Sequence, residues 1–389
     1  MAPTPAPSAV APVADGGSPT RAPEHSPQSR STRVASLDAF RGLTILGMLL
    51  VNNVALDQAT PVQLTHAPWG QGVRFADLVF PWFLLIVGVA IPFSAASARR
   101  RGVPAWRWDL RVLTRTALLV LLGCLIDSSI AHRPVFGLGV LQLIGLAYCV
   151  GALLHDLPLE RRLLIAGGLL VTHWLTIRYM PVPGLGPGIF TERENIISHL
   201  NWQYLEPMHL RGLLSVVPTA ALVLIGAALG ELLGRDALTP ARKAGSLLFA
   251  GLGLLALGWL WSFDLPFSKS IWTASYVVFA AGSGAVVLGL LHLMMDVNGW
   301  RAWAWPLVVL GANAIFAYVV PILTKLWVLQ SWSWTVADGS TLSLQDALLH
   351  GAIGHAGRIG GGWLYTVGYI VVWWLVTLIL YRKRVFLRV

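Results

Sequence analysis

Long apolar runs, separated by clusters of Pro, Gly and charged residues, dominate the chain from residue 34 onward. A helix needs about 20 predominantly apolar residues to cross roughly 30 Å of hydrocarbon at 1.5 Å per residue. Runs of this length recur ten times and predict an all-α fold, a polytopic transmembrane helix bundle of about ten spans. The predicted spans are residues 37–56, 75–96, 110–130, 136–155, 160–178, 212–233, 244–263, 271–295, 304–330 and 361–381.

The sequence also predicts a kink in the ninth run, two long loops and an N-terminal tail. The ninth run is overlong and contains Pro321, which removes a helix hydrogen bond and predicts a kink. Two long loops, 179–211 and 331–358, are expected, with a short interfacial helix at 342–349 in the second. Residues 1–33 are rich in Pro, Ala and Ser and lack an apolar signal-peptide core, so they predict a disordered cytoplasmic tail. Residues 34–389 then form the membrane domain.

Composition supports lipid as the solvent for most of the chain. Hydrophobic residues make up 56% of the 389 and charged residues 12%, outside the range of ordinary soluble domains. The net charge is +10, yet the basic residues form short clusters beside apolar runs instead of the basic, aromatic surface that reads nucleic acid. The two cysteines, Cys124 and Cys149, lie inside apolar runs and support neither a disulfide framework nor a metal site.

The distribution of Lys and Arg predicts the orientation, because basic loops resist translocation and stay cytoplasmic. With the N-terminus inside, twenty of the 28 basic residues lie on the cytoplasmic side. An even number of spans then places the C-terminus in the cytoplasm as well. The remaining eight are spread singly on the outer side: Arg74, Arg133, Arg178, Arg193, Arg211, Lys269, Lys325 and Arg358.

Polar side chains at membrane depth gather in the first predicted hairpin. Such groups are costly in hydrocarbon unless they are paired, so they point to a cavity or a functional site. Two lie at the cytoplasmic edge of the first span, two at its outer end, and three precede or begin the second span: Asp38, Arg41, Asn52, Asn53, His66, Trp69 and Asp77. One hairpin therefore lines both faces of the membrane.

Each of these residues also has a purely structural interpretation. Asp38 and Arg41 form an i,i+3 pair at a helix start, where a carboxylate also favours the helix dipole. Asn52 and Asn53 are suited to capping a helix end, and a lone loop histidine such as His66 is usually a solvated residue. Spacing alone does not decide between these interpretations.

Three further features limit the chemistry. The other histidines lack the spacing and the paired carboxylates of a zinc site, so no metal is expected. Gln142 suits an interhelical hydrogen bond, and Asn313 suits either such a bond or a functional role. No internal repeat is evident, which weakens the interpretation as an inverted-repeat transporter.

An ordered set of motifs resembles the heparan-alpha-glucosaminide N-acetyltransferase family of transmembrane acyltransferases. The resemblance runs from Arg33 to the end of the chain. In order, the motifs are Ser36-Leu-Asp-Ala-Phe-Arg-Gly-Leu-Thr-Ile, Val51-Asn-Asn, His66-Ala-Pro-Trp, Ala76-Asp-Leu-Val-Phe-Pro-Trp-Phe, Gly139-Val-Leu-Gln, Pro266-Phe-Ser-Lys-Ser-Ile-Trp-Thr-Ala-Ser-Tyr, Gly311-Ala-Asn-Ala and Leu380-Tyr-Arg-Lys-Arg-Val-Phe.

The resemblance implies an acyltransferase that takes acetyl-CoA from the cytoplasm and acetylates an amine, an amino sugar or envelope glycan, on the other side of the bilayer. Its acetyl-handling histidine matches His66, with Asn52 and Asp77 in support. The candidate cofactor-binding residues are Arg33, Arg41 and Asn313, and the candidate substrate-binding residues are Asn53, Trp69, Lys269 and Trp272. The competing hypothesis is a transporter or flippase of a sugar- or lipid-linked substrate, without acyl chemistry.

The sequence also departs from the family pattern. It lacks the large lumenal N-terminal domain of the lysosomal relatives, has one extra residue between His66 and Asp77, and carries Leu143 where an arginine often follows Gly-Val-Leu-Gln. The resemblance is therefore to the bacterial branch, which implies a bacterial plasma membrane and leaves the acceptor undefined. The oligomeric state stays open, a homo-oligomer included.

His66 suits two mechanisms, because a neutral imidazole can attack a thioester or deprotonate an amine. An outer histidine and a cytoplasmic cofactor can meet if the acetyl-pantetheine arm threads into the bundle or if the His66 loop dips inward. We predict an enclosed tunnel with a basic cytoplasmic mouth.

Overall fold

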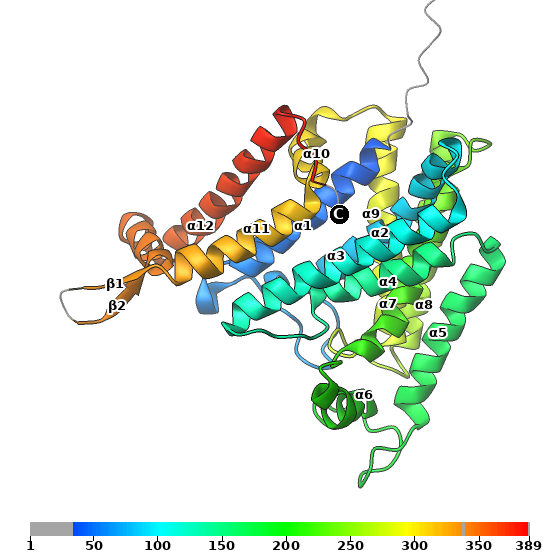
Figure 1. The fold of residues 1–389 in the computed structure, drawn as a ribbon, viewed down its shortest axis with the longest axis horizontal. Coiled ribbons are helices and arrows are strands. Elements are labelled where there is room, and N and C mark those ends of the chain that lie inside the picture. Colours follow the sequence, from blue (N-terminus) through cyan, green and yellow to red (C-terminus); the bar gives the residue numbers. More distant parts are fainter. Residues whose placement is uncertain (1–33, 337–338, 388–389) are drawn as a thin grey trace, which may run out of the picture. The chain divides into compact units, whose positions relative to one another are not determined.

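The computed structural model describes residues 34–336 and 339–387, and Arg33 and the predicted tail 1–33 lie outside that part of the chain. Helices make up nearly all of the described structure (Figure 1). They are α1 (Ala35–Asn53), α2 (Phe75–Arg100), α3 (Ala105–Ala131), α4 (Val140–Leu153), α5 (Leu159–Tyr179), α6 (Ile196–Leu200), α7 (Val216–Gly234), α8 (Pro240–Trp261), α9 (Ala274–His292), α10 (Trp305–Ala312), α11 (Ala314–Thr324) and α12 (Leu344–Arg382).

Short elements complete the described chain. Strands β1 (Ser333–Thr335) and β2 (Thr341–Ser343) form an antiparallel hairpin in which Ser333 pairs with Ser343. Single turns of 3-10 helix occupy Asp57–Ala59, Val62–Leu64, Glu206–Met208, Leu213–Ser215 and Ala302–Ala304, and π-helical turns occupy Asn201–Leu205, Leu293–Val297 and Lys325–Gln330.

Each predicted span coincides with a helix, but not every helix has the length and composition of a membrane span. Six segments do: Ala35–Asn53, Phe75–Arg100, Leu213–Gly234, Pro240–Trp261, Ala274–Val297 and Leu344–Arg382. The bent pair Ala302–Ala312 and Ala314–Gln330 makes a seventh if it crosses as one span. The chain is thus a multi-pass membrane protein with six or seven candidate spans by this measure.

The ninth predicted span breaks at Asn313 and not at Pro321, which corrects the predicted position of the kink. The two halves are bent by 66°, and Asn313 has non-helical backbone angles of φ −126° and ψ 46°. Its side-chain amide donates to the carbonyl of Val385 at 3.1 Å and accepts from the N–H of Leu387 at 2.9 Å. These bonds to the C-terminal segment hold the break, whereas Pro321 stays inside α11.

The predicted interfacial segment belongs to a longer helical element than expected. Residues from Leu344 onward are helical, and the helix is interrupted at Gly357, whose φ of 70° and ψ of 173° lie outside the helical region. Glycine adopts this conformation without the steric cost that a Cβ would add. The first part of α12 is therefore a separate helical piece that follows the β1–β2 hairpin (Figure 1).

Glycines let the central helices approach closely. A Cβ on Gly226 of α7 would overlap the Leu85 carbonyl of α2, and a Cβ on Gly42 of α1 would overlap the Leu307 carbonyl of α10. Small residues at such crossings are the usual means of packing helices in a membrane, where lipid tails are as apolar as side chains. Helix α1 thus packs closely against α10, and α2 packs closely against α7. These two helices, α1 and α2, carry residues of the predicted site.

Candidate active site

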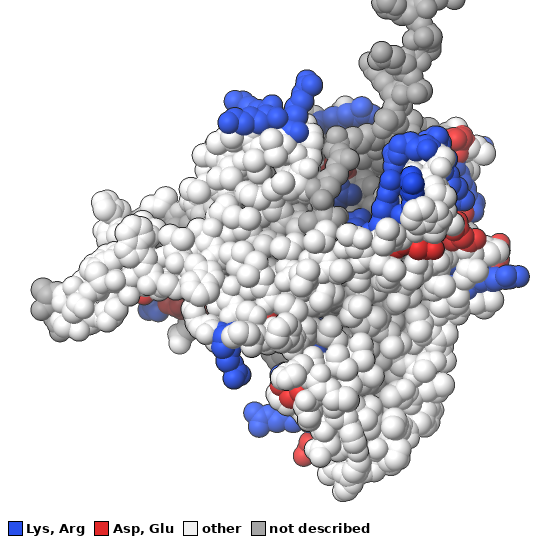
Figure 2. Space-filling view, in the orientation of Figure 1, with Lys and Arg blue, Asp and Glu red and all other residues white. Residues whose placement is uncertain are grey.

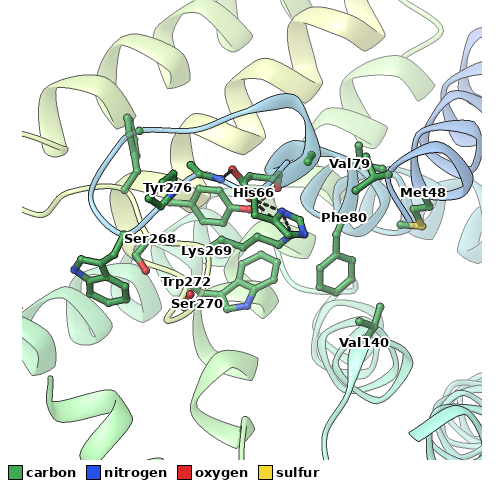
Figure 3. A pocket seen from close by; sticks show the side chains of 18 of the residues that line it. Met48, His66, Val79, Phe80, Val140, Ser268, Lys269, Ser270, Trp272 and Tyr276 are labelled. Carbon is green, nitrogen blue, oxygen red and sulfur yellow. Dashed lines mark hydrogen bonds and ion pairs between the residues drawn. The ribbon is translucent and has the colours of Figure 1, made fainter. Parts of the chain in front are cut away.

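A cavity of about 610 Å³ lies where the C-terminal end of α1 meets the N-terminal end of α2. Met48, Val51 and Asn52 line it from α1, and Ala76, Asp77, Val79 and Phe80 line it from α2. The His66–Trp69 loop and the Phe267–Trp272 segment close two further sides (Figure 3). Side chains from parts of the chain that are far apart in sequence therefore face one space.

His66 and Asp77 are in direct contact in this cavity. His66 Nδ1 lies 2.8 Å from Asp77 Oδ1, and the histidine side chain is 58% exposed while the carboxylate is 5% exposed. An ionised carboxylate only accepts hydrogen bonds, so we assign the imidazole proton to Nδ1. Nε2 then carries a lone pair and has no protein partner among the described residues. The ring is accessible, and its orientation is fixed by a buried anion.

The carboxylate of Asp77 is itself held by the start of α2. Its Oδ2 accepts the backbone N–H groups of Ala67 at 3.0 Å and Arg74 at 3.1 Å. The Arg74 bond is half of a capping box, in which the third residue of a helix reaches back to its N-cap. Capping therefore leaves Oδ1 directed at the histidine.

A proline in α2 explains a further contact at the same residue. Pro81 has no N–H and cannot bond to the carbonyl four residues earlier, which belongs to Asp77. The hydroxyl of the buried Tyr276 in α9 donates to that carbonyl at 2.6 Å. The proline thus frees an acceptor that ties α9 to the catalytic end of α2.

Lys269 lies beside the His66–Asp77 pair. Its Nζ is 3.2 Å from His66 Nδ1 and 3.9 Å from Asp77 Oδ1. With the proton on Nδ1, the lysine makes no hydrogen bond to the ring, and its attraction is to the carboxylate. A tight loop presents it: Ser268 N–H donates to Thr273 Oγ1 at 3.0 Å, and Thr273 N–H donates to the Ser268 carbonyl at 3.1 Å. Burial lowers the pKa of Lys269 below that of a solvated lysine, and the charge of Asp77 offsets part of this effect.

We expect Lys269 to react with acetic anhydride at a lower pH than a solvated lysine, because a lowered pKa leaves more free amine at any given pH. The Asp77→Asn variant should react faster still, since the charge that favours the Lys269 ammonium is gone. Peptide mapping after timed treatment at mildly alkaline pH measures both rates. Equal rates in the two proteins would contradict the assigned ion pair.

Aromatic side chains form the walls of the cavity. Trp272 has a left-handed backbone, with φ of 53°, and packs edge-on against Phe80 at 5.4 Å and Tyr276 at 5.7 Å between ring centroids. On another side, Trp69 packs against Phe190 at 4.9 Å and donates its indole N–H to the Phe190 carbonyl at 3.4 Å. The first long loop, which also contributes Glu192, therefore covers part of the cavity.

Asn52 lies on the boundary between this cavity and a second one of about 410 Å³. Its side chain is exposed to both, and its backbone carbonyl accepts from Lys325 Nζ at 3.1 Å. Asn53 lines the second cavity only, and its side-chain amide donates to the Leu49 carbonyl of its own helix at 2.8 Å. Asn52 is thus placed to meet a ligand, and Asn53 is largely occupied by α1.

Two predicted cofactor-binding residues lie apart from these cavities. Arg41 pairs with Asp38 at 3.2 Å and precedes Asn52 by eleven residues, roughly 16 Å along α1 at 1.5 Å per residue. Asn313 is fully buried at the α10–α11 break, bonded to the C-terminal backbone. The third predicted residue, Arg33, lies outside the described residues.

The structure brings six predicted site residues to one cavity: Asn52, His66, Trp69, Asp77, Lys269 and Trp272. Sequence reasoning did not find Arg74, Tyr276 or Glu192. Arg74 precedes Asp77 by three residues, so the capping-box spacing was a usable signal. Tyr276 and Glu192 carry no local signal, because their roles depend on the packing of distant segments.

The site has a nucleophilic or basic nitrogen, a buried carboxylate that orients it, and an ammonium next to both. Such a trio suits proton transfer or acyl transfer to a substrate in the cavity.

A family model and two known proteins relate the chain to the same family. The family model for the catalytic domain of heparan-alpha-glucosaminide N-acetyltransferase matches residues 33–259. The mouse enzyme of that name is 24% identical over 446 aligned residues, 96% of this chain and 64% of the mouse protein. The human enzyme is 24% identical over 428, covering 92% of this chain and 60% of the human protein. The chain therefore spans less than two thirds of these relatives' length. Since the family match covers more than half of the chain, the chain belongs to the family of the heparan-alpha-glucosaminide N-acetyltransferase catalytic domain.

Proposed function

We propose that the chain transfers an acetyl group from acetyl-CoA to an amine on the extracytoplasmic side of a membrane, with His66 as the reacting group. The observation that carries the proposal is the 2.8 Å contact of His66 Nδ1 with the buried Asp77, which leaves Nε2 available in a substrate-sized cavity. Family membership supports the choice of reaction, and the geometry of the cavity supports the choice of His66.

The proposal includes ten crossings, both termini in the cytoplasm, and a bacterial plasma membrane. The short, mostly buried helix α4 would then cross within the bundle, and α5, whose Leu164 and Val171 are exposed, would cross at its edge. Figure 2 shows most of the visible Lys and Arg in the upper part of the view and a few at the lower centre, with a broad band of uncharged surface between them. That distribution fits basic loops retained in the cytoplasm, and the proposal assigns the His66 cavity to the opposite face.

The cavity fits the acyl end of the proposed donor. Val51, Val79, Phe80 and Trp272 offer apolar walls, and Asn52 offers an amide that can hold a carbonyl oxygen. Along α1, the lining of both cavities begins at Met48, roughly 10 Å short of Arg41 at 1.5 Å per residue. The helices would therefore have to separate over that distance to form an enclosed passage from the cavities to a phosphate site at Arg41. That passage stays a prediction.

Two routes use the same residues. In the direct route, the amine nitrogen attacks the acetyl carbon, the carbon–sulfur bond breaks, and His66 Nε2 takes the proton that the amine loses. In the two-step route, Nε2 attacks the thioester, the thiolate leaves, and the amine then takes the acetyl group from the imidazole. Asp77 keeps the proton on Nδ1 in both routes.

The remaining site residues are assigned to substrate. Lys269 and Trp272 lie on the wall of the cavity that faces His66, and Trp69 connects it to the covering loop. The Lys269 ammonium would stabilise negative charge on the thioester oxygen in the transition state. Asn53 would contact the substrate in the second cavity, and its exposed neighbour Asn52 lies at the boundary of that cavity.

One observation favours transport as a second candidate function. The 66° break between α10 and α11 resembles the discontinuous helices that bind substrates in transporters. The side chain at the break is occupied by the C-terminal backbone, however, so it offers no polar group to a passing substrate.

The test measures transfer and transport on the same vesicles. Protein in sealed liposomes receives labelled acetyl-CoA outside and a panel of amines inside, and both acetylated amine and amine movement are followed. We expect acetylated product only when both substrates are present. Amine movement without acetyl-CoA would support the transporter. Intact-protein mass after acetyl-CoA alone then separates the routes, since an acetyl adduct mapping to His66 requires two steps.

A further inference from the structure

The second cavity contains a charged residue that the mechanism above does not use. It lies between α1, α3, α4 and α11 and shares Met48, Asn52, Val140 and Tyr318 with the His66 cavity. The two cavities are therefore neighbours across Asn52 and Tyr318. Asp127 of α3 is the one acidic residue among the described side chains that line the second cavity.

The carboxylate of Asp127 is held in place by a neutral neighbour. Gln142 Nε2 of α4 donates to Asp127 Oδ2 at 2.7 Å, and the glutamine is fully buried. Among the described residues, no Lys, Arg or His comes within 4.0 Å of the Asp127 oxygens. Asp127 follows the apolar stretch 117–126 of α3, and a carboxylate in such surroundings is costly unless a cation or several donors satisfy it. Oδ1 is left as an acceptor beside the cavity.

Two glycines make the space for this pair. A Cβ on Gly139 would lie 2.5 Å from Asp127 Oδ2 and 2.8 Å from Oδ1. A Cβ on Gly123 would overlap the side-chain amide of Gln142. Any larger residue at either position would displace the carboxylate or the amide, so the backbone around Asp127 is shaped to hold it in one orientation.

We propose that Asp127 binds the protonated amine of the acceptor in the second cavity, next to the cavity where acetyl transfer takes place. This inference rests on the proposed function for its choice of ligand. An ammonium group offers only donors, which is what a fixed carboxylate with a remaining acceptor oxygen requires. The one Lys in the lining, Lys325, donates to the Asn52 carbonyl and does not take the place of the ligand.

The ion pair would also make the Asp127 site bind the acceptor more tightly than the acetylated product. Acetylation turns the amine into a neutral amide, which has no positive charge for Asp127 to bind. The amine leaves Asp127 when it moves to the neighbouring cavity and gives its proton to His66, and the neutral product has no charge with which to return. The next charged acceptor can therefore occupy the Asp127 site. Asp127 acts in this scheme as a specificity-determining residue for binding and takes no part in breaking the thioester.

The test is a binding measurement that needs no turnover. Isothermal titration of the purified full chain compares glucosamine, the charged probe, with N-acetylglucosamine, the same ring without the charge. We expect the wild-type chain to bind glucosamine at least about tenfold more tightly. In Asp127→Asn this preference should disappear through loss of glucosamine affinity, because an asparagine oxygen keeps the bond from Gln142 while the charge is gone.

Two further variants serve as comparisons: one displaces the Asp127 carboxylate while keeping its charge, and the other neutralises an aspartate outside the cavities. Gly139→Ala leaves the Asp127 charge and displaces the carboxylate, so it should weaken glucosamine binding as well. Asp57→Asn makes the same chemical change at an exposed position outside both cavities, and it should bind like wild type.

Equal binding of the two sugars by wild type, absence of glucosamine binding, or full glucosamine affinity in a folded Asp127→Asn protein would overturn the inference. Glucosamine binding that depends on Asp127, without acetyl transfer to any amine, would instead leave the amine site standing and remove the proposed reaction. Where transfer is observed, Asp127→Asn should raise the KM for the amine about tenfold or more and leave the KM for acetyl-CoA and the kcat at saturating amine unchanged.

Discussion

Replacing His66 with alanine is expected to lower kcat/KM for acetyl transfer by about 10³-fold or more. Both proposed routes need the Nε2 lone pair, and a positioned proton acceptor or nucleophile contributes on this scale. The side chain is 58% exposed, so its removal opens no buried void and the fold should persist. Initial rates with labelled acetyl-CoA and a saturating amine measure the effect, with binding of acetyl-CoA followed separately.

The control for this variant is His350→Ala. His350 is an exposed histidine in α12, outside both cavities, and its removal makes the same chemical change without touching the site. It should transfer acetyl groups at the wild-type rate. A His66→Ala protein that folds, binds acetyl-CoA and keeps more than about a tenth of the wild-type rate would remove His66 from the mechanism.

The helices were predictable because length and apolarity determine them locally. Each apolar run in the sequence is helical in the structure, the ninth as two helices, since a chain in lipid must satisfy its own backbone groups. The position of the kink was not predictable in the same way. Pro321 was the local signal, but the bonds between Asn313 and residues 385 and 387 outweigh it, and they join positions far apart in the sequence.

The candidate site likewise combines contacts that the local sequence predicts with contacts that depend on tertiary packing. His66 and Asp77 lie eleven residues apart, flanking one helix start, and their contact follows from a loop that returns to the N-cap of α2. Lys269 reaches the pair from more than two hundred residues away. Its predicted position near the outer start of the eighth span made it a candidate substrate residue, but its distance to His66 Nδ1 depends on how α9 packs against α2.

Asp127 shows that a local signal can also be overlooked. An acidic residue inside the apolar run 110–130 already pointed to a polar site at membrane depth. Gln142 in the next span was interpreted as an interhelical hydrogen-bond partner, and its bond to Asp127 at 2.7 Å confirms that interpretation. What the sequence did not contain was the adjacency of this pair to the His66 cavity, which arises from the packing of α3 and α4 against α1 and α11.

Asp77→Asn should lower kcat about 10²- to 10³-fold with a smaller effect on the KM for either substrate. The asparagine oxygen can still accept from Ala67 and Arg74, so the cap of α2 survives. Its amide nitrogen then faces His66 Nδ1 and donates to it, which forces the imidazole proton onto Nε2. A carboxylate-to-amide change behind a catalytic histidine costs up to about 10⁴ through this wrong tautomer. The loss should be smaller here, because an exposed ring can exchange tautomers through water.

The tautomer argument has a direct check in the nitrogen NMR shifts of His66. In wild type, Nδ1 should carry the proton at neutral pH, and in Asp77→Asn the proton should move to Nε2. Asp77→Ala provides the contrast, since it removes the helix cap along with the charge and should lower the thermal midpoint as well as the rate. An Asp77→Asn protein with the wild-type tautomer and a slow rate would mean that the carboxylate acts through its charge on Lys269 or the substrate, and not through the orientation of the ring.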